Sequence, residues 1–122
     1  MNEESRQAAP DPFAYYDRLR RLRGFVDQHY AEAITASTAA KVVGLAEKYF
    51  STFFHQKVGT TFGAWLRQYR IAKAKELLGS RNLTVSQVAE RVGFRDLSTF
   101  IRAFKKRENL TPSAYKKLVR PS

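Results

Sequence analysis

An internal repeat limits what this chain can fold into more than any other feature of its sequence. Residues 35–45 (TASTAAKVVGL) align with residues 84–94 (TVSQVAERVGF) at an offset of 49, with five identities in eleven positions. After the shared glycine the second copy gains one residue, and Phe50 and Phe54 then match two further phenylalanines at an offset of 50. A matched glycine followed by two matched aromatic residues argues against a chance similarity. The chain therefore contains two copies of one structural unit.

Each copy of the repeat is typical of a helix, a tight turn and a second helix. A small residue, Ala40 or Ala89, permits close approach of the second helix, and four residues later a glycine occupies the turn. We expect Gly44 and Gly93 to adopt positive φ, where a Cβ would be costly. The second helix of each copy then buries aromatic and small residues, namely Phe50, Phe53 and Phe54 in the first and Phe100, Ala103 and Phe104 in the second. This spacing predicts a helix-turn-helix, whose second helix can enter a major groove of DNA.

The rest of the chain also has helical periodicity from Phe13 onward. Leu19, Leu22 and Val26 recur at three- and four-residue steps, which predicts a first helix from about Phe13 to Tyr30. No run of alternating β-branched residues is long enough for a strand. The sequence therefore predicts an all-α fold of about seven helices, with two helix-turn-helix subdomains joined by a long linker helix.

The predicted boundaries follow from the same patterns. Residues 1–12 lack periodicity and contain two prolines, which indicates a flexible tail or a linker remnant. Residues 13–122 form the predicted domain, with helix-turn-helix motifs at about 36–58 and 85–107 and the linker helix at about 62–78. Phe62, Trp65, Leu66, Tyr69, Leu77 and Leu78 should form the inward side of this linker helix, and Trp65 and Tyr69 are expected in the core with the phenylalanines.

The charge of the chain points to a polyanionic partner. The formal net charge is +11, and residues 1–12 contribute one base and three acids. The remaining 110 residues therefore carry 21 bases against 8 acids, a net charge of +13. Nucleic acid is the first candidate for such a partner. A solubilising surface without a partner is the simpler alternative.

Several classes of protein are not expected from the composition. No stretch of 18 apolar residues exists for a membrane span, and the N-terminus has no apolar segment typical of a secretory signal. The absence of cysteine excludes disulfides and thiolate metal sites and suits a cytoplasmic protein. His29 and His55 have no carboxylate or second histidine at ligand spacing, and no glycine-rich phosphate loop is present. We therefore expect no metal site, no cofactor and no catalysis.

Two segments carry a specific family resemblance. Residues 93–117 (GFRDLSTFIRAFKKRENLTPSAYKK) resemble the C-terminal signature of the bacterial AraC/XylS transcription regulators, and residues 44–78 look like that family's first recognition helix and linker helix. The resemblance covers about residues 19–118. It implies a bilobed all-α domain whose two helix-turn-helix subdomains bind adjacent major grooves. The expected function is sequence-specific binding of double-stranded DNA at promoter sites, with regulation of transcription as an activator.

The chain departs from the family pattern at six positions, two of which, Ala36 and Ala39, replace larger apolar residues in the first motif. Asn109 stands where glycine is usual, but asparagine tolerates the left-handed conformation, so the turn should survive. Lys116 replaces an arginine and keeps the charge. Ala46 stands where a capping serine is usual, and Thr52 occupies a position often held by an arginine that reads bases. The first motif should therefore be the weaker of the two in direct readout.

The resemblance also assigns candidate DNA contacts. The base-reading positions that it implies are Lys48, Ser51, Thr52 and Gln56 in the first recognition helix, and Leu97, Ser98, Ile101 and Arg102 in the second. Arg102 is the strongest candidate, because a guanidinium can bond bidentately to guanine O6 and N7. The expected phosphate contacts are Lys105, Lys106, Thr111 and Lys116. For Lys105 and Lys106, favourable interaction with the helix dipole is an alternative explanation.

Two other functions remain open at this point. The chain could be an interaction module that docks on an acidic partner such as RNA polymerase, with DNA binding secondary. It could also bind nucleic acid or an anionic membrane without specificity through the arginine-rich first helix. For the leading function we expect a monomeric module in the cytoplasm, associated with the nucleoid, with RNA polymerase as a partner and no small-molecule effector site. Whether such a module stands alone or belongs to a longer regulator cannot be deduced from these residues.

Overall fold

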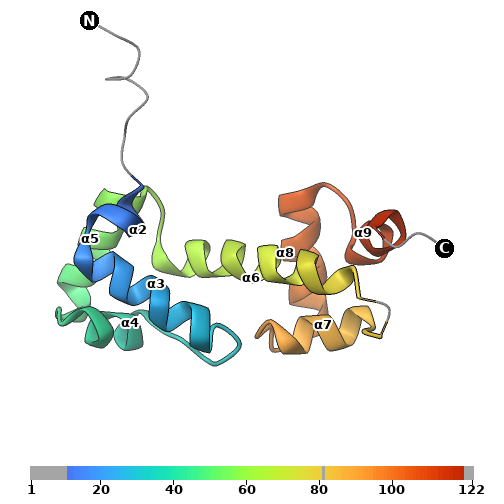
Figure 1. Cartoon of the computed structure of the whole chain (residues 1–122), viewed down its shortest axis with the longest axis horizontal. Coiled ribbons are helices and arrows are strands. Elements are labelled where there is room, and N and C mark those ends of the chain that lie inside the picture. Colours follow the sequence, from blue (N-terminus) through green and yellow to red (C-terminus); the bar gives the residue numbers. More distant parts are fainter. Residues whose placement is uncertain (1–10, 81, 120–122) are drawn as a thin grey trace, which may run out of the picture. The chain divides into compact units, whose positions relative to one another are not determined.

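The fold is α-helical, as the sequence predicts. The computed structural model describes residues 11–80 and 82–119, and these residues form eight helices and no strand (Figure 1). In chain order the helices are α2 (Pro12–Tyr15), α3 (Asp17–His29), α4 (Ala36–Val43), α5 (Glu47–Val58), α6 (Phe62–Leu78), α7 (Val85–Arg91), α8 (Leu97–Glu108) and α9 (Pro112–Val119). None of the helices in this described part is long and apolar enough to cross a membrane.

The first predicted helix is divided into two, so the expectation of one helix from Phe13 to Tyr30 is wrong. Tyr16 separates α2 from α3 with an extended backbone, φ −99° and ψ 123°. Its ring packs edge-on against Phe53 at a centroid distance of 6.3 Å, and the Lys57 ammonium lies 5.0 Å from its centroid. Tertiary packing of one aromatic ring thus accompanies a break that the periodicity does not reveal.

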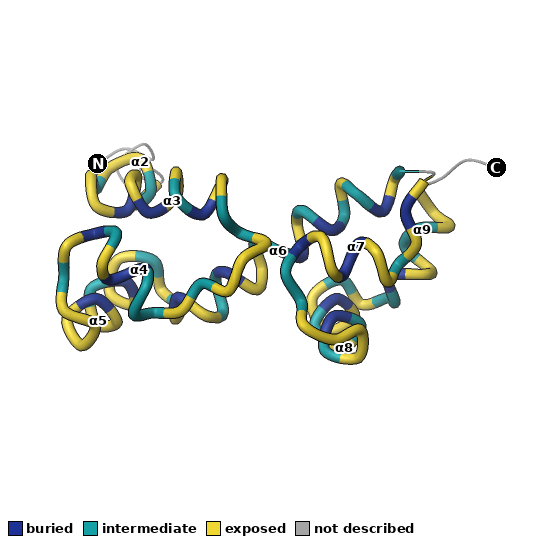
Figure 2. The backbone as a smooth tube through the Cα atoms, turned by 90° about the horizontal axis from the view of Figure 1, so that it is seen from below, coloured by how far each residue is buried: buried dark blue, intermediate teal, exposed yellow. Residues whose placement is uncertain are grey.

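The chain divides into two compact units, and each contains one helix-turn-helix. The first comprises residues up to His29 together with Ile34–Phe62, and the second comprises Tyr30–Ala33 with the residues from Gly63 onward. Both units contain fully buried segments of their own, as Figure 2 shows in dark blue. Each unit therefore has a separate hydrophobic core.

The core of the first unit is built around an aromatic cluster. Phe50, Phe54 and Phe62 contact one another with ring centroids 5.6 to 5.7 Å apart, two of the three pairs in edge-to-face geometry. Aromatic pairs favour such offset arrangements. The other buried residues come from α3 and α4, namely Leu19, Leu22, Val26, Ala39, Ala40 and Val43.

The core of the second unit repeats this plan with different residues. Phe100 contacts Phe94 at 5.2 Å and Phe104 at 5.8 Å, and Phe104 contacts Tyr115 at 5.5 Å. The buried residues of this core are Ile71, Ala74, Leu78, Leu83, Val88, Ala89, Val92, Phe100 and Phe104.

Three aromatic residues that were expected in the core are not fully buried. Trp65 and Tyr69, expected in the core, are only half-buried, and their rings pack on each other at 5.5 Å. Ile71 and Ala74 of the same helix are buried instead. Phe53, expected to be buried with Phe50 and Phe54, is half-buried and packs against the half-buried ring of Tyr16.

The two turns have the same hydrogen bonds, which confirms the structural repeat. In the first, the Leu45 N–H donates to the Ala40 carbonyl at 3.0 Å, and in the second the Phe94 N–H donates to the Ala89 carbonyl at 3.0 Å. A bond between residues five apart across a left-handed glycine defines the Schellman motif. The predicted positive φ is confirmed for both glycines, with values of 74° at Gly44 and 99° at Gly93.

Side chains cap several of the helices. Thr35 caps α4 by accepting from the Thr38 N–H, and Thr84 forms a complete capping box with Gln87 at the start of α7. Ala46 gives α5 no side-chain cap. Asn109 ends α8 in the left-handed conformation, with φ 67°, as expected.

Asp96 caps α8 through two contacts with one residue. Its carboxylate accepts hydrogen bonds from the Thr99 N–H at 2.7 Å and from the Thr99 hydroxyl at 3.0 Å. The hydrogen bond from the Thr99 N–H contributes most to lowering the pKa of Asp96. The bond from the Thr99 hydroxyl and the nearby positive charge of Arg102 also lower this pKa. The charged carboxylate therefore stabilises the start of this helix.

The surroundings of the two turn glycines differ, and this gives a test by substitution. A Cβ on Gly93 would lie 3.0 Å from the Arg70 Nε, 3.0 Å from the Tyr30 carbonyl oxygen and 3.1 Å from the Ala31 Cα, whereas Gly44 has open space around it. Gly44→Ala should lower the free energy of unfolding by about 1–2 kcal/mol, from the left-handed backbone alone. Gly93→Ala should lower it by clearly more, because backbone atoms must also shift. Chemical denaturation of both variants checks this, and equal losses would contradict it.

The capping contacts of Asp96 give a test by pH. Because its pKa is lower in the folded protein, the charged side chain contributes stability well above the unfolded value of about 3.9, and this contribution disappears as the pH falls through the folded value. Asp96→Asn keeps a capping side chain but removes the charge. Wild type should therefore melt at a higher temperature than Asp96→Asn at pH 7, and the difference should vanish in strong acid.

Thr84→Ala is the matched control for the test by pH. It removes an uncharged cap in the same unit, so its cost of about 1 kcal/mol should not depend on pH. A melting difference between wild type and Asp96→Asn that stays constant from neutral to acid pH would show that the charge is not involved.

Candidate nucleic-acid interface

The second helix of the first motif, α5, separates a buried face from an exposed one. Phe50 and Phe54 are fully buried, while Lys48, Ser51, Thr52 and Gln56 are all exposed. The Thr52 hydroxyl donates to the Lys48 carbonyl within the helix at 3.5 Å. The structure therefore places the four candidate residues of this helix on its solvent side.

The second helix of the second motif, α8, is divided in the same way. Ser98 and Arg102 are exposed, and Leu97 is an exposed apolar side chain at 40 %. Ile101 is only half-buried and packs against the core of this unit, so less of its surface is available than expected. The Arg102 guanidinium lies 3.4 Å from the Thr99 hydroxyl, one turn earlier on the helix.

The candidate phosphate contacts fall into two groups. Lys105 and Lys106 are exposed in the last turn of α8, next to Arg107. Thr111 instead caps α9, because its hydroxyl oxygen accepts from the Ala114 N–H at 3.1 Å. Pro112 follows it without an N–H, which leaves few free donors at this helix start.

Lys116 differs most from the sequence prediction. Its side chain is half-buried, and its ammonium group donates a hydrogen bond to the Leu83 carbonyl oxygen. This carbonyl lies in the segment before α7, so the lysine links two parts of its own unit. A phosphate contact would compete with this internal bond, and the sequence gives no sign of it because the residues are 33 positions apart.

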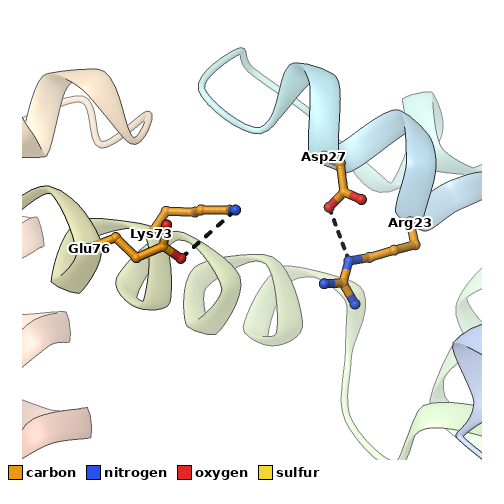
Figure 3. A network of polar contacts seen from close by, with 4 residues as sticks. All are labelled: Arg23, Asp27, Lys73 and Glu76. Carbon is orange, nitrogen blue, oxygen red and sulfur yellow. Dashed lines mark hydrogen bonds and ion pairs between the residues drawn. The ribbon is translucent and has the colours of Figure 1, made fainter.

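Internal partners also engage most of the arginines of α3. Arg18 donates to the Val43 carbonyl at 3.0 Å, Arg20 pairs with Asp17, and Arg23 pairs with Asp27 at 3.1 Å (Figure 3). On α6, Lys73 lies 4.0 Å from Glu76, and this pair is also drawn in Figure 3. Such exposed pairs contribute little to stability, but they neutralise the charge locally.

Two exposed residues near the candidate sites were not predicted from the sequence. Tyr49 of α5 is 66 % exposed beside Lys48, although an aromatic residue in a helix with aromatic core positions suggests burial. Arg67 of α6 lines a cleft of about 730 Å³ together with residues of α8. Only the packing of α6 against α8 reveals this neighbourhood, since the two segments are about thirty residues apart.

Across the described residues, no group of three histidine, aspartate or glutamate side chains could hold a metal ion.

The half-buried side chain of Arg70 binds backbone groups of its own unit and is not among the candidate DNA contacts. Its Nε donates to the Tyr30 carbonyl at 2.8 Å, and its terminal nitrogen donates to the Glu32 carbonyl at 2.7 Å. Burial lowers the pKa of this guanidinium. The residue holds the segment Tyr30–Ala33 within the second unit, beside the turn at Gly93.

Comparison with known proteins gives a family match and several relatives. A family model described as a helix-turn-helix domain matches residues 39–118. The transcriptional activator NphR of a Rhodococcus species is 35% identical over 100 residues, which is 81% of this chain and 30% of NphR. The chain spans only 30% to 40% of the length of the curated regulators that it matches.

Solved structures of similar fold agree with this match. The C-terminal domain of AraT, a response regulator from Geobacillus stearothermophilus, is 30% identical with a TM-score of 0.80, covering 88% of this chain and 89% of that one. The DNA-binding domain of AdpA, a global transcriptional factor solved in complex with a target DNA, is 25% identical with a TM-score of 0.78, covering 84% and 93%. The family and these relatives are transcriptional regulators, not enzymes, as the sequence predicts. The chain therefore belongs to the helix-turn-helix domain family of the AraC-type transcriptional regulators.

Proposed function

We propose that this chain binds double-stranded DNA sequence-specifically at promoter sites and regulates transcription. In this proposal α5 and α8 act as recognition helices, each entering a major groove, and the two grooves are adjacent. The observation that carries it is the division of both helices into a face of buried phenylalanines and a face of exposed polar residues. The AdpA domain, which is similar in fold, was solved with a target DNA.

The proposed base-reading residues are exposed on the two helices, except for half-buried Ile101. Arg102 would read guanine through O6 and N7, and Leu97 would contact a thymine methyl group. Ser98 and Ile101 complete this helix, and the residues of the first helix are Lys48, Ser51, Thr52 and Gln56. Because the Thr52 hydroxyl already bonds within its helix, the first motif contributes less direct readout.

Lys105 and Lys106 provide the proposed phosphate contacts at the end of α8. Thr111 assists through the start of α9, although its hydroxyl already caps that helix. We leave Lys116 out of the proposed interface, because its ammonium group bonds to the Leu83 carbonyl. For Lys116 we propose a role in stabilising the second unit instead.

The remaining parts of the proposal concern the cellular setting. We propose that the chain acts as an activator, since its relative NphR is named a transcriptional activator. RNA polymerase is then the natural protein partner, and the site of action is the nucleoid in the cytoplasm. The module itself would bind as a monomer, with no small-molecule effector site of its own.

The distribution of paired and unpaired basic side chains supports α8, rather than the arginine-rich first helix, as a DNA-binding surface. Three arginines of α3 are engaged by internal acceptors, namely Arg18, Arg20 and Arg23. The basic residues of α8 have no ion pair among the described residues. The positive charge that is available to a partner is therefore greater on the recognition helix.

The proposal is tested first with the unmodified protein. A duplex selected by the protein from a random library and a scrambled duplex of equal length are titrated at one fixed salt concentration. Specific recognition predicts affinities that differ by about a thousandfold or more, the range typical of such proteins. Equal affinity for both duplexes would overturn sequence-specific binding.

Substitutions on the two helices separate base reading from phosphate contact. Arg102→Ala should weaken binding to the selected duplex by about 1–3 kcal/mol and relax the preference at one or two base pairs. Lys106→Ala should weaken selected and scrambled duplexes alike, because phosphates carry no sequence. Thr52→Ala should have a smaller effect than Arg102→Ala. Binding curves on both duplexes check this, and an equal loss on both for Arg102→Ala would show that another residue reads the base.

A further inference from the structure

A positively charged cleft lies between α6 and α8 within the second unit. Its volume is about 730 Å³, and its polar lining consists of Arg67, Gln68, Thr99, Arg102, Lys106 and Arg107. Buried Ile71 and half-buried Ala103 also line it. Four cationic side chains thus surround one cleft, and no carboxylate is among its lining residues.

The cations of this cleft lack internal partners. Within residues 11–80 and 82–119, no hydrogen bond or ion pair involves the side chains of Arg67, Lys106 or Arg107. Arg102 reaches only the Thr99 hydroxyl, at 3.4 Å. On α3, by contrast, two aspartates neutralise two arginines in the same sequence segment. Like charges gathered without counter-charges repel one another, so the cleft favours an anionic ligand.

The acidic residues nearest in sequence are engaged elsewhere. Glu108 follows Arg107 directly, but its carboxylate pairs with Lys75 at 3.0 Å. Asp96 accepts both of its hydrogen bonds from Thr99 at the start of α8. Neither carboxylate therefore forms an ion pair with a cleft cation, although the charge of Arg102 acts on Asp96 from nearby.

We propose that this cleft binds a backbone phosphate of the DNA, with Arg67 and Arg107 as phosphate-binding residues. The inference rests on the proposed function, because a groove-bound α8 would carry the cleft to the phosphates that border that groove. Guanidinium groups bond phosphate oxygens bidentately and keep their charge at all physiological pH values. The Gln68 amide adds a neutral donor beside them. The linker helix α6 thereby becomes part of the DNA interface.

The dependence of binding on salt tests this inference. Arg67→Gln and Arg107→Gln are compared with wild type on the selected duplex over a series of salt concentrations. For each lost phosphate contact, the slope of log K against log salt should become shallower by about 0.9. Affinity at low salt should fall roughly tenfold, and by the same factor on the selected and scrambled duplexes, as for a charged hydrogen bond to phosphate.

Arg21→Gln is the matched control, because Arg21 is an exposed arginine of α3 with no assigned role. It removes the same charge and should leave the slope unchanged. If wild type binds the duplex and Arg67→Gln and Arg107→Gln both behave like Arg21→Gln, the cleft does not hold a DNA phosphate. If wild type binds no duplex, the proposed function itself fails. Using two cleft variants keeps the test decisive if one of them misfolds, as judged by its melting curve.

A second titration separates DNA from free anions as the source of the phosphate. Inorganic phosphate is added to the isotope-labelled protein, and the amide signals of Thr99 and Ala103 are followed. For a DNA phosphate, we expect only weak, non-saturating changes at millimolar phosphate, while the duplex shifts the same signals to saturation. Saturation by inorganic phosphate below a millimolar, with unchanged duplex slopes in the variants, would assign the cleft to a small anion instead.

Discussion

A pair of buried phenylalanines, four residues apart, orients the second helix of each helix-turn-helix motif. Phe50 and Phe54 in α5, and Phe100 and Phe104 in α8, are fully buried. Residues at this spacing share one helix face, so burying them directs the opposite face to solvent. Removing one such ring costs about 3–5 kcal/mol, more than a typical exposed polar contact contributes. The cores therefore determine which residues face outward, and the polar residues on the outer faces are free to serve binding.

The two motifs share this plan but differ in how firmly each is built. In the second, Asp96 caps α8 and the turn at Gly93 packs closely against Arg70 and Tyr30. In the first, α5 has no side-chain cap and the turn at Gly44 has open space around it. The two copies of the motif therefore share the same backbone turn, but the contacts around the turn and the cap of the second helix differ. This asymmetry parallels the contrast between Thr52, bonded within its helix, and the exposed Arg102.

Local features could be predicted from the sequence, whereas long-range contacts could not. The positive φ of the turn glycines and the left-handed conformation of Asn109 depend on a few neighbouring residues, and both predictions are confirmed. The break at Tyr16, the Lys116 bond to Leu83 and the cleft beside Arg67 depend on segments that meet only in the folded chain. Hydrophobic periodicity carries no information about contacts between distant segments. For this reason it predicted half-buried Trp65 in the core.

Recognition of DNA by both motifs is tested most directly by following the backbone amides of the labelled protein during titration with its selected duplex. The largest signal changes should fall on the exposed residues of α5 and α8, from Lys48 to Gln56 and from Leu97 to Lys106. Smaller changes should accompany them at the start of α9. Changes confined to α3, or to one of the two units alone, would contradict recognition by two helix-turn-helix motifs.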